Sequence, residues 1–228
     1  MSPPAPEEPP TKHSFSFWGC SELPESLGLR ATNERDLLER LETVDPDSIY
    51  YHTVRSLLRR QVLRSSQPND FAAWVAEEVR DPALAERLAL QSPFDFENIE
   101  AFREHLLATL DDHLMRLPFA PRTITGRPFH FLVGHLHELP LELTVADLTG
   151  FGRAIGEVDE SSIYYHAVES MGRLGKPRSD FAEWMDQGLG RGRLAREIDQ
   201  LDPFALSLDG LRLRLLELVD AALGKRAK

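Results

Sequence analysis

Apolar residues recur along this chain at two spacings, and the same order of spacings occurs twice. Near the start of each half, aromatic and polar residues alternate, as in Phe15-Ser16-Phe17 and Phe129-His130-Phe131, which predicts a short strand. Leucines and other apolar residues then recur every three or four positions, which predicts a series of amphipathic helices. The pattern favours a mainly helical chain with one short strand in each half.

Two motifs make the repetition specific. Residues 48–52 and 162–166 both read Ser-Ile-Tyr-Tyr-His, and residues 70–74, Asp-Phe-Ala-Ala-Trp, return as Asp-Phe-Ala-Glu-Trp at 180–184. Such self-similarity indicates a tandem duplication. We therefore predict a mainly α fold, with two tandem five-helix units related by a pseudo-two-fold axis and one short strand in each.

The predicted strands need partners, because unpaired backbone groups are costly when buried. We expect the segments Phe15–Phe17 and Phe129–Phe131 to pair with each other. The alternative is pairing between two chains in a homodimer.

Helix starts and chain boundaries follow from local signals. Asn69-Asp70 and Asp81-Pro82 are typical N-cap sequences, and Asp180 with Glu183 resembles a capping box. The predicted boundaries are a disordered Pro-rich leader (1–12), a first repeat (13–117), a linker (118–128), a second repeat (129–224) and a basic tail (225–228).

Composition narrows the possible functions. The 228 residues carry a formal net charge of −11, which disfavours binding to nucleic acid or to an anionic membrane surface. The chain has one cysteine, Cys20, and no apolar run of the length that a membrane helix needs. It begins with no recognisable secretion signal. We therefore expect a cytoplasmic protein.

The two recurring histidines, His52 and His166, are the first candidates for a ligand site, because histidine is the usual general base and metal ligand. The alternative is a structural role, in which each imidazole is partly buried and bonded to a carbonyl or carboxylate. The adjacent Tyr51 and Tyr165 are further ligand candidates, although packing with a satisfied hydroxyl also explains such residues.

Three other residues complete the set of ligand candidates. Glu22 and Glu138 each begin the triplet Glu-Leu-Pro and could orient the histidine of their half. Trp18 has no aromatic counterpart, since Leu132 stands at the equivalent place, so we expect Trp18 to be exposed. Trp74 and Trp184 follow a phenylalanine at helical spacing and are expected in the core.

Motifs for familiar chemistry are absent from the sequence. There is no G-x-G-x-x-G, G-x-x-x-x-G-K-[ST], H-E-x-x-H, C-x-x-C or G-x-S-x-G pattern. His135-x-His137 could place two imidazoles on one face of a strand, but a closed zinc site needs four ligands. No cofactor and no metal are predicted from the sequence.

The recurring motifs are similar to those of an uncharacterised bacterial family, domain of unknown function five-seven-five-two. The resemblance rests on Ser48–His52, Asn69–Trp74, Leu84-Ala85 and Asp202-Pro203-Phe204, and it covers nearly everything after residue 13. Members that resemble this chain carry more histidines after Tyr-Tyr-His, where residues 53–58 here have none. The resemblance implies no known activity.

The sequence therefore favours a non-enzymatic binding or regulatory module for an unknown small molecule or protein. One alternative is a metal-binding or hydrolytic enzyme that uses His52 or His166 with Glu22 or Glu138. Another is a scaffold whose acidic helix faces bind a protein partner.

Overall fold

The structure is a computed structural model that describes residues 14–63, 67–119, 126–174 and 178–224. The predicted leader (1–12), the predicted tail (225–228) and most of the predicted linker (118–128) lie outside the described residues.

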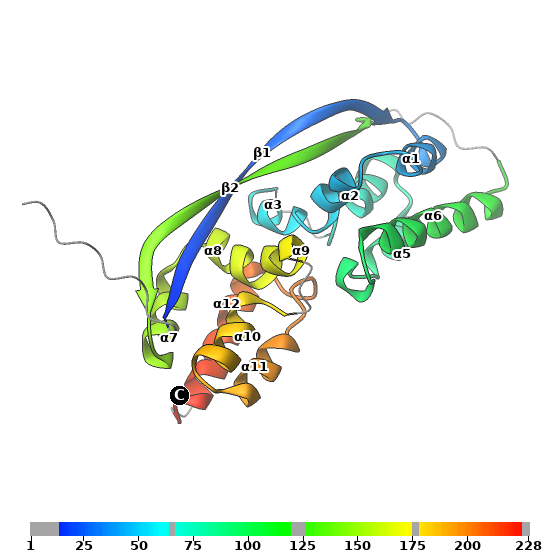
Figure 1. The fold of residues 1–228 in the computed structure, drawn as a ribbon. Coiled ribbons are helices and arrows are strands. Elements are labelled where there is room, and N and C mark those ends of the chain that lie inside the picture. The colour runs from blue at the N-terminus through cyan, green and yellow to red at the C-terminus, as the bar shows by residue number, and fades with distance from the viewer. Residues whose placement is uncertain (1–13, 64–66, 120–125, 175–177, 225–228) are drawn as a thin grey trace, which may run out of the picture. The chain divides into compact units, whose positions relative to one another are not determined.

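The strands are far longer than the sequence predicts. β1 (Phe15–Ala31) and β2 (Phe129–Val145) each have 17 residues and pair in a two-stranded sheet (Figure 1). The Ser16 and Thr144 hydroxyls lie 3.1 Å apart, and Nε2 of His135 lies 2.7 Å from a carboxylate oxygen of Glu25. These two contacts give an antiparallel register.

The predicted fold class is therefore wrong, and the fold is mixed α and β. The two Phe-x-Phe segments do belong to paired strands, but Ser16 lies beside Thr144 rather than beside the start of β2. Beyond Phe17, glycine, cysteine and proline interrupt the alternating pattern, so a pattern of period two cannot extend the strand. Pairing with a distant strand keeps the chain extended there, which is tertiary context overriding local preference.

The helices also differ from the predicted two sets of five. Between the strands they are α1 (Glu34–Leu41), α2 (Pro46–Thr53), α3 (Ser56–Leu63), α4 (Asp70–Trp74), η1 (Val75–Val79), α5 (Pro82–Ala89), η2 (Pro93–Asp95) and α6 (Ile99–Arg116). After β2 they are α7 (Leu148–Glu157), α8 (Glu160–Tyr164), η3 (Tyr165–Glu169), α9 (Ser170–Leu174), α10 (Asp180–Glu183), η4 (Trp184–Gly188), α11 (Gly192–Asp199) and α12 (Leu208–Ala222).

The apolar spacing predicts continuous helices at several places where the structure has a short η segment next to an α-helix. η1, η3 and η4 are π-helical, whereas η2 is a short 3₁₀ turn. A π-helical turn holds more residues than an α-helical one, and these single turns lie within stretches that the apolar spacing predicts as one helix. No helix among the described residues is long and apolar enough to cross a lipid bilayer.

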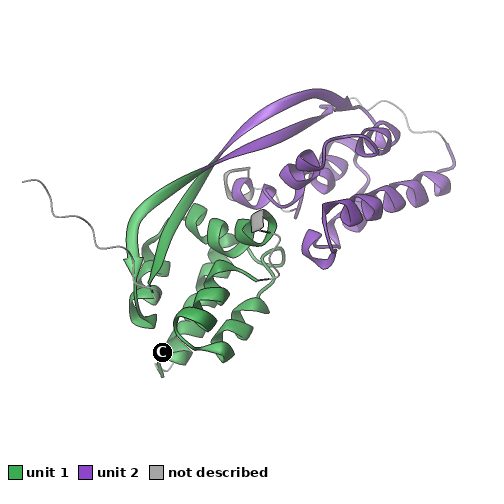
Figure 2. Ribbon diagram, in the orientation of Figure 1, with its two compact units in different colours: residues 1–21, 138–228 green, residues 22–137 purple. Residues whose placement is uncertain are grey.

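The chain forms two compact units that exchange strand segments. One consists of residues 1–21 and 138–228, and the other of residues 22–137 (Figure 2). The first unit contains the helices that follow β2 in the sequence, together with the end of β2 and the beginning of β1. The second unit contains the helices that follow β1, together with the end of β1 and the beginning of β2.

Aromatic rings anchor these exchanged segments. In the first unit the Phe15 ring lies 5.6 Å from that of Phe181 and 5.4 Å from that of Trp184. In the second unit the Phe129 ring lies 5.1 Å from that of Phe71 and 5.8 Å from that of Trp74. In each unit, the phenylalanine and the tryptophan of the Asp-Phe-x-x-Trp motif therefore form the apolar surface against which the incoming strand packs.

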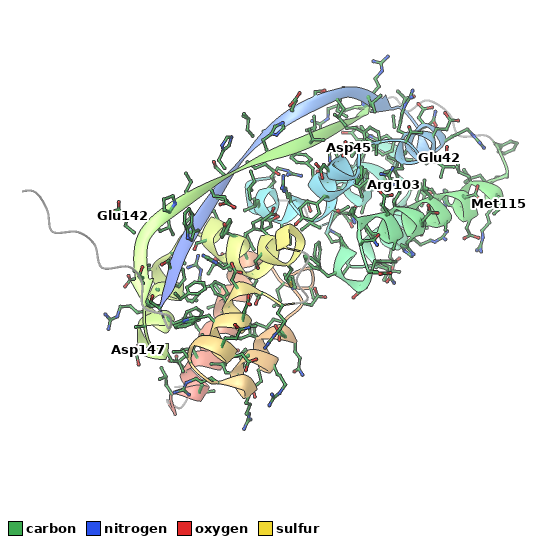
Figure 3. The ribbon with its side chains drawn as sticks, viewed as in Figure 1. Glu42, Asp45, Arg103, Met115, Glu142 and Asp147 are labelled. Atoms are coloured by element: carbon green, nitrogen blue, oxygen red, sulfur yellow. The ribbon has the colours of Figure 1, made fainter. Side chains whose placement is uncertain are left out.

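In each unit an arginine, buried in one case and half-buried in the other, bonds the carbonyls at the end of a helix. Arg103 of α6 donates to the carbonyl of Leu41 at the end of α1, over 2.8 Å (Figure 3). Arg212 of α12 donates to the carbonyls of Ile155 and Val158 at the end of α7, both at 2.7 Å. These bonds satisfy carbonyls that have no partner within their own helix.

In the part of the chain that the structure describes, the sheet has two strands, so each strand has one edge without a neighbouring strand. Exposed prolines, Pro24 and Pro140, interrupt both strands. Positive φ angles occur at Gly28 (70°) and Glu142 (48°), the latter labelled in Figure 3. Prolines and local distortions of this kind oppose the addition of a further strand at a free edge.

We predict that Trp74→Ala and Trp184→Ala each lower the free energy of unfolding by about 3–5 kcal/mol, as large-to-small changes in a core do. Trp74 is 7% exposed and Trp184 is 8% exposed, and both contact the incoming strand. Chemical denaturation measures the change. Trp18→Ala is the matched control, because this indole is 36% exposed. A loss for the buried tryptophans no larger than that of the control would contradict the prediction.

Candidate functional site

The recurring histidines lie at equivalent places in the two units. His52 is in α2 and His166 is in η3, and each residue is 3% exposed. The two imidazole rings contact the phenylalanine that begins the incoming strand, at 4.7 Å from Phe129 and 4.7 Å from Phe15 respectively. Both histidines therefore lie in the core, directly beneath a strand.

Both nitrogens of each ring have a partner. Nδ1 of His52 lies 2.8 Å from Oδ2 of Asp70, and its Nε2 accepts a hydrogen bond from the backbone N–H of Leu132 over 2.9 Å. Nδ1 of His166 lies 3.0 Å from Oδ2 of Asp180, and its Nε2 accepts from the N–H of Trp18 over 2.9 Å.

These partners fix the tautomer. Since Nε2 faces an N–H donor it acts as the acceptor, and the proton is on Nδ1, facing the carboxylate. An Asp–His pair of this kind resembles part of a catalytic triad, but a backbone amide stands where a nucleophile or a metal would be. The Nε2 lone pair is thus already used to bind a strand.

Burial lowers the pKa of His52 below its ordinary value of 6.5, and the hydrogen bond and charge of Asp70 oppose this only in part. The bond that Nε2 accepts requires a neutral imidazole, and the lowered pKa favours this neutral form. Protonation of Nε2 would place two donors face to face.

The aspartates that bond these histidines directly follow the residues that cap α4 and α10. Asn69 caps α4 by accepting from the N–H of Ala72, and Ser179 caps α10 by accepting from that of Ala182. Asn69 belongs to the predicted Asn69-Asp70 cap, whereas Ser179 lies one residue before the predicted Asp180. In both helices the aspartate that follows the cap bonds the histidine. The signal was present in the sequence, because the aspartate recurs together with the histidine in both halves.

An arginine that sequence reasoning missed connects the candidates of the second unit. Arg59 donates to a carboxylate oxygen of Glu22 at 2.6 Å and of Asp70 at 2.8 Å, and to the backbone carbonyl of Tyr51 at 2.9 Å. Its guanidinium also lies 3.8 Å from the centre of the Tyr51 ring. Arg59 and Asp70 thus link Glu22 to His52.

The β2 backbone approaches this charged group closely at Gly134. Its carbonyl accepts from Arg55 at 2.5 Å, and a Cβ atom there would lie 2.2 Å from Glu22 and 2.7 Å from Tyr51. Only glycine fits such an approach. Tyr51, which is 3% exposed, therefore packs between the arginine and the strand.

The first unit fills the equivalent space differently. Cys20 is buried there and its thiol lies 3.5 Å from the carbonyl of Ser161. Tyr164 is fully buried and donates to a carboxylate oxygen of Glu169 over 2.8 Å, whereas Tyr165 is 4% exposed. Arg173 stands at the place of Arg59 in the sequence of this half, and its side chain lies outside the described residues.

The other candidate residues are exposed. The side chains of Glu138, His135 and His137 all lie at the surface, and His135 forms an ion pair with Glu25. Trp18 is 36% exposed, although its backbone N–H is held by His166. The two strands are equal in length, so their sequences can be aligned from the first phenylalanine of each. In this alignment Glu22 corresponds to Leu136. Glu138 then corresponds to Pro24 rather than to Glu22.

A pocket in the first unit has a volume of about 30 Å³. Apolar side chains and two polar ones line it, including Met171, Ser179, Ile198 and Asp199. This volume holds roughly a water molecule or two, whereas small-molecule sites span roughly 300–1,000 Å³.

Comparison with known proteins places the chain in a family. The model of a family of unknown function, DUF5752, matches residues 12–220, and the chain belongs to that family. The structure is similar to the solved structure of OrfY from Thermoproteus tenax, with a TM-score of 0.77 and 27% sequence identity. That similarity covers 92% of this chain and 96% of OrfY. No curated protein matches the sequence.

We predict that His52→Gln and His166→Gln lower the free energy of unfolding by comparable amounts, about 1–3 kcal/mol each. Each imidazole satisfies one buried backbone amide and one carboxylate, and glutamine reproduces these contacts only imperfectly. Thermal or chemical denaturation measures both losses. A large loss for one variant beside a neutral result for the other would contradict equal structural roles.

The lowered pKa of His52 also predicts a dependence of stability on pH. Its contribution is complete above about pH 6.5, where the ring is neutral in both states. As the pH falls below this value, the imidazole of His52 binds a proton in the unfolded chain but stays neutral in the folded protein. The free energy of unfolding then falls by up to about 1.4 kcal/mol per pH unit, until the pH passes the folded pKa.

Denaturation of wild type and His52→Gln between about pH 7.5 and pH 5 tests this dependence. The variant is expected to lose less stability over that range, whereas His135→Gln, which removes an exposed imidazole, should follow wild type. Parallel curves for wild type and His52→Gln would show that this histidine does not cause the dependence.

Proposed function

We propose that the protein is a non-enzymatic binding module whose partner is another protein, and that Trp18 is part of the contact surface. The observation that carries this proposal is the contrast among the three tryptophans. Trp74 and Trp184 are 7% and 8% exposed, whereas Trp18 is 36% exposed on β1. Tryptophan is among the residues that contribute most to binding energy at protein interfaces.

The position of Trp18 is fixed before any partner arrives. His166 accepts the backbone N–H of Trp18, and the neighbouring Phe17 is 1% exposed. A side chain on such a rigid support loses little conformational freedom on binding, which favours affinity. Leu132 occupies the equivalent place in β2, so this exposed indole is not something that the fold requires.

A catalytic role for the recurring histidines receives less support. His52 and His166 both use Nδ1 for an aspartate and Nε2 for a backbone amide. A reaction at either ring would have to break a bond that holds a strand. Glu22 is engaged by Arg59, and the Glu138 side chain lies at the surface.

A protein partner suits this surface better than a small molecule does. Small ligands favour concave sites, whereas Trp18 lies on a strand of a two-stranded sheet. The prolines at positions 24 and 140 and the two positive φ angles disfavour addition of a partner's strand. We therefore expect contact through side chains. We further propose a cytoplasmic location, consistent with a single cysteine that forms no disulfide.

Affinity capture with the full chain tests the proposal, and the matched variant is Trp18→Leu. Leucine copies the residue at the equivalent place and keeps the N–H that His166 accepts. Leu213→Ala removes another exposed apolar side chain, 60% exposed on α12, and serves as the control. The captured proteins are identified by mass spectrometry, and the affinity of each purified partner is then measured by titration.

We expect one protein partner to bind wild type and Leu213→Ala alike, and to bind Trp18→Leu more weakly by about tenfold or more. Equal affinity for wild type and Trp18→Leu would contradict a role for Trp18. Capture of no protein, together with a small molecule retained in native mass spectrometry, would contradict a protein partner.

A further inference from the structure

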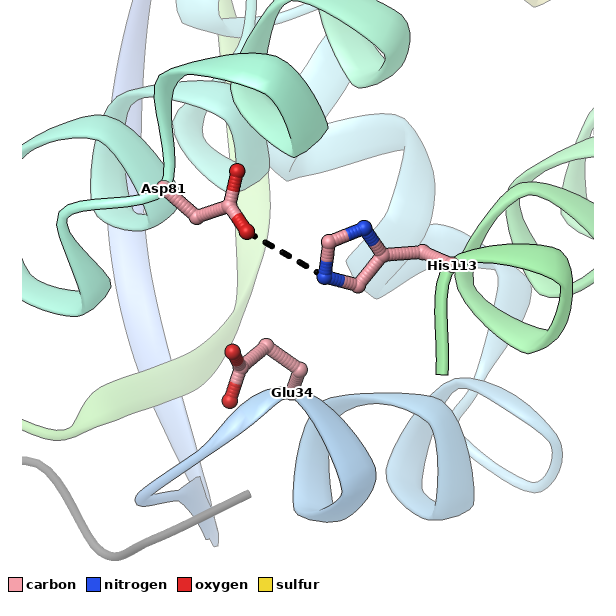
Figure 4. A group of neighbouring side chains, drawn as sticks. All are labelled: Glu34, Asp81 and His113. Carbon is pink, nitrogen blue, oxygen red and sulfur yellow. Dashed lines mark ion pairs between the residues drawn. The ribbon is translucent and has the colours of Figure 1, made fainter. Parts of the chain in front are cut away.

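Three side chains outside the histidine–aspartate pairs converge within the second unit. Glu34 begins α1, Asp81 caps α5, and His113 lies in the last turn of α6. One ligand atom from each lies within 4.8 Å of the other two. Figure 4 shows the three side chains reaching the same place from three separate elements.

Burial makes this cluster unlike an ordinary group of surface charges. Glu34 is 8% exposed, and no hydrogen bond or ion pair to another described residue accompanies its carboxylate. An isolated buried carboxylate is costly unless a cation or hydrogen-bond donors compensate it. A cation beside this carboxylate would compensate that cost.

The imidazole of His113 supplies a second, independent sign of a missing partner. Its side chain is 12% exposed, and its Nε2 atom is buried without a hydrogen bond. Nε2 lies 3.2 Å from Oδ2 of Asp81, yet the geometry between them is not that of a hydrogen bond. Oδ1 of Asp81 is already used, because it accepts from the backbone N–H of Leu84 at 2.9 Å.

We propose that Glu34, Asp81 and His113 bind a divalent transition-metal ion of the zinc class. One imidazole and two carboxylates are ligands that zinc accepts, and their two negative charges match the charge of the ion. Zinc lies about 2.0–2.2 Å from such ligands, so neighbouring ligand atoms of a tetrahedral site are roughly 3.3–3.6 Å apart. The 3.2 Å between Nε2 and Oδ2 is close to that spacing.

The other half of the chain lacks all three ligands. Counting from the helix starts, Leu148, Arg191 and Ala222 stand at the equivalent places in α7, at the cap of α11 and in α12. These residues cannot bind zinc together, although their helices correspond in order and capping position. The cluster is therefore an addition to one half and not a requirement of the helical arrangement.

Titration of the chelator-treated full chain with Zn²⁺ tests the proposal, using calorimetry to measure stoichiometry and affinity. Co²⁺ serves as a spectroscopic probe, because its visible absorption reports the ligand geometry. The variants are Glu34→Gln, Asp81→Asn and His113→Gln. Asparagine is itself a good helix cap, so Asp81→Asn keeps the start of α5 intact. A double variant, His135→Gln with His137→Gln, removes two exposed imidazoles as a control for binding at the surface.

Wild type and the double control variant are expected to bind one equivalent of Zn²⁺ and to melt at a higher temperature with it. Each of the three cluster variants should bind more weakly by at least about tenfold and should lose the shift in melting temperature. Circular dichroism checks that each variant is folded, and Asp81→Asn decides the result if another variant is not.

Two outcomes would overturn the proposal. One is a wild-type protein that binds neither Zn²⁺ nor Co²⁺. The other is binding that survives in the cluster variants and disappears in the double control variant. Neither outcome depends on Trp18 or on a protein partner.

Discussion

The hydrogen bond from a strand amide to a buried, neutral imidazole is the interaction on which the rest of this fold depends. A two-stranded sheet cannot satisfy backbone groups that face away from the partner strand, and a buried N–H without an acceptor is costly. His52 and His166 supply that acceptor, each through Nε2. The aspartate that faces Nδ1 makes Nε2 the acceptor. One imidazole therefore connects three elements: the helix that carries it, the strand whose amide it binds, and the start of the helix that carries the aspartate.

The same bond occurs in both units, but its surroundings differ. Around His52, an arginine gathers two carboxylates, and Gly134 lets the strand approach closely. Around His166, a buried cysteine and a tyrosine–glutamate pair fill the equivalent space. The same histidine–aspartate pair and the same bond to a strand amide occur in both units beside these different neighbours. The shared motif is sufficiently explained by folding.

Sequence reasoning found the parts of this structure that are encoded locally. Helix positions, the buried tryptophans and the two aromatic strand starts follow from spacing and capping signals within a few residues. The full strands do not, because Pro24 and Pro140 interrupt a pattern that distant pairing then overrides. The π-helical segments do not either, since each is a single turn joined to an α-helix.

The candidate sites show the same limit more sharply. The aspartate partner of each histidine was visible in the recurring motif, but the earlier cap residue, Asn69 or Ser179, hid its role. Arg59 did have a signal, because Arg173 also stands seven residues after the histidine of its half. The cluster of Glu34, Asp81 and His113 comes from three helices far apart in the sequence, and only the tertiary fold unites them.

Function is best sought where the two halves of the chain differ. A residue that recurs in both halves satisfies the fold in both, as the histidines do, and its recurrence is no sign of a ligand. Trp18 faces solvent where the other half has leucine, and Glu34 is buried where the other half has Leu148. These features lie in different compact units, so removing one leaves the contacts of the other in place. The shared framework can therefore support two separate specialisations.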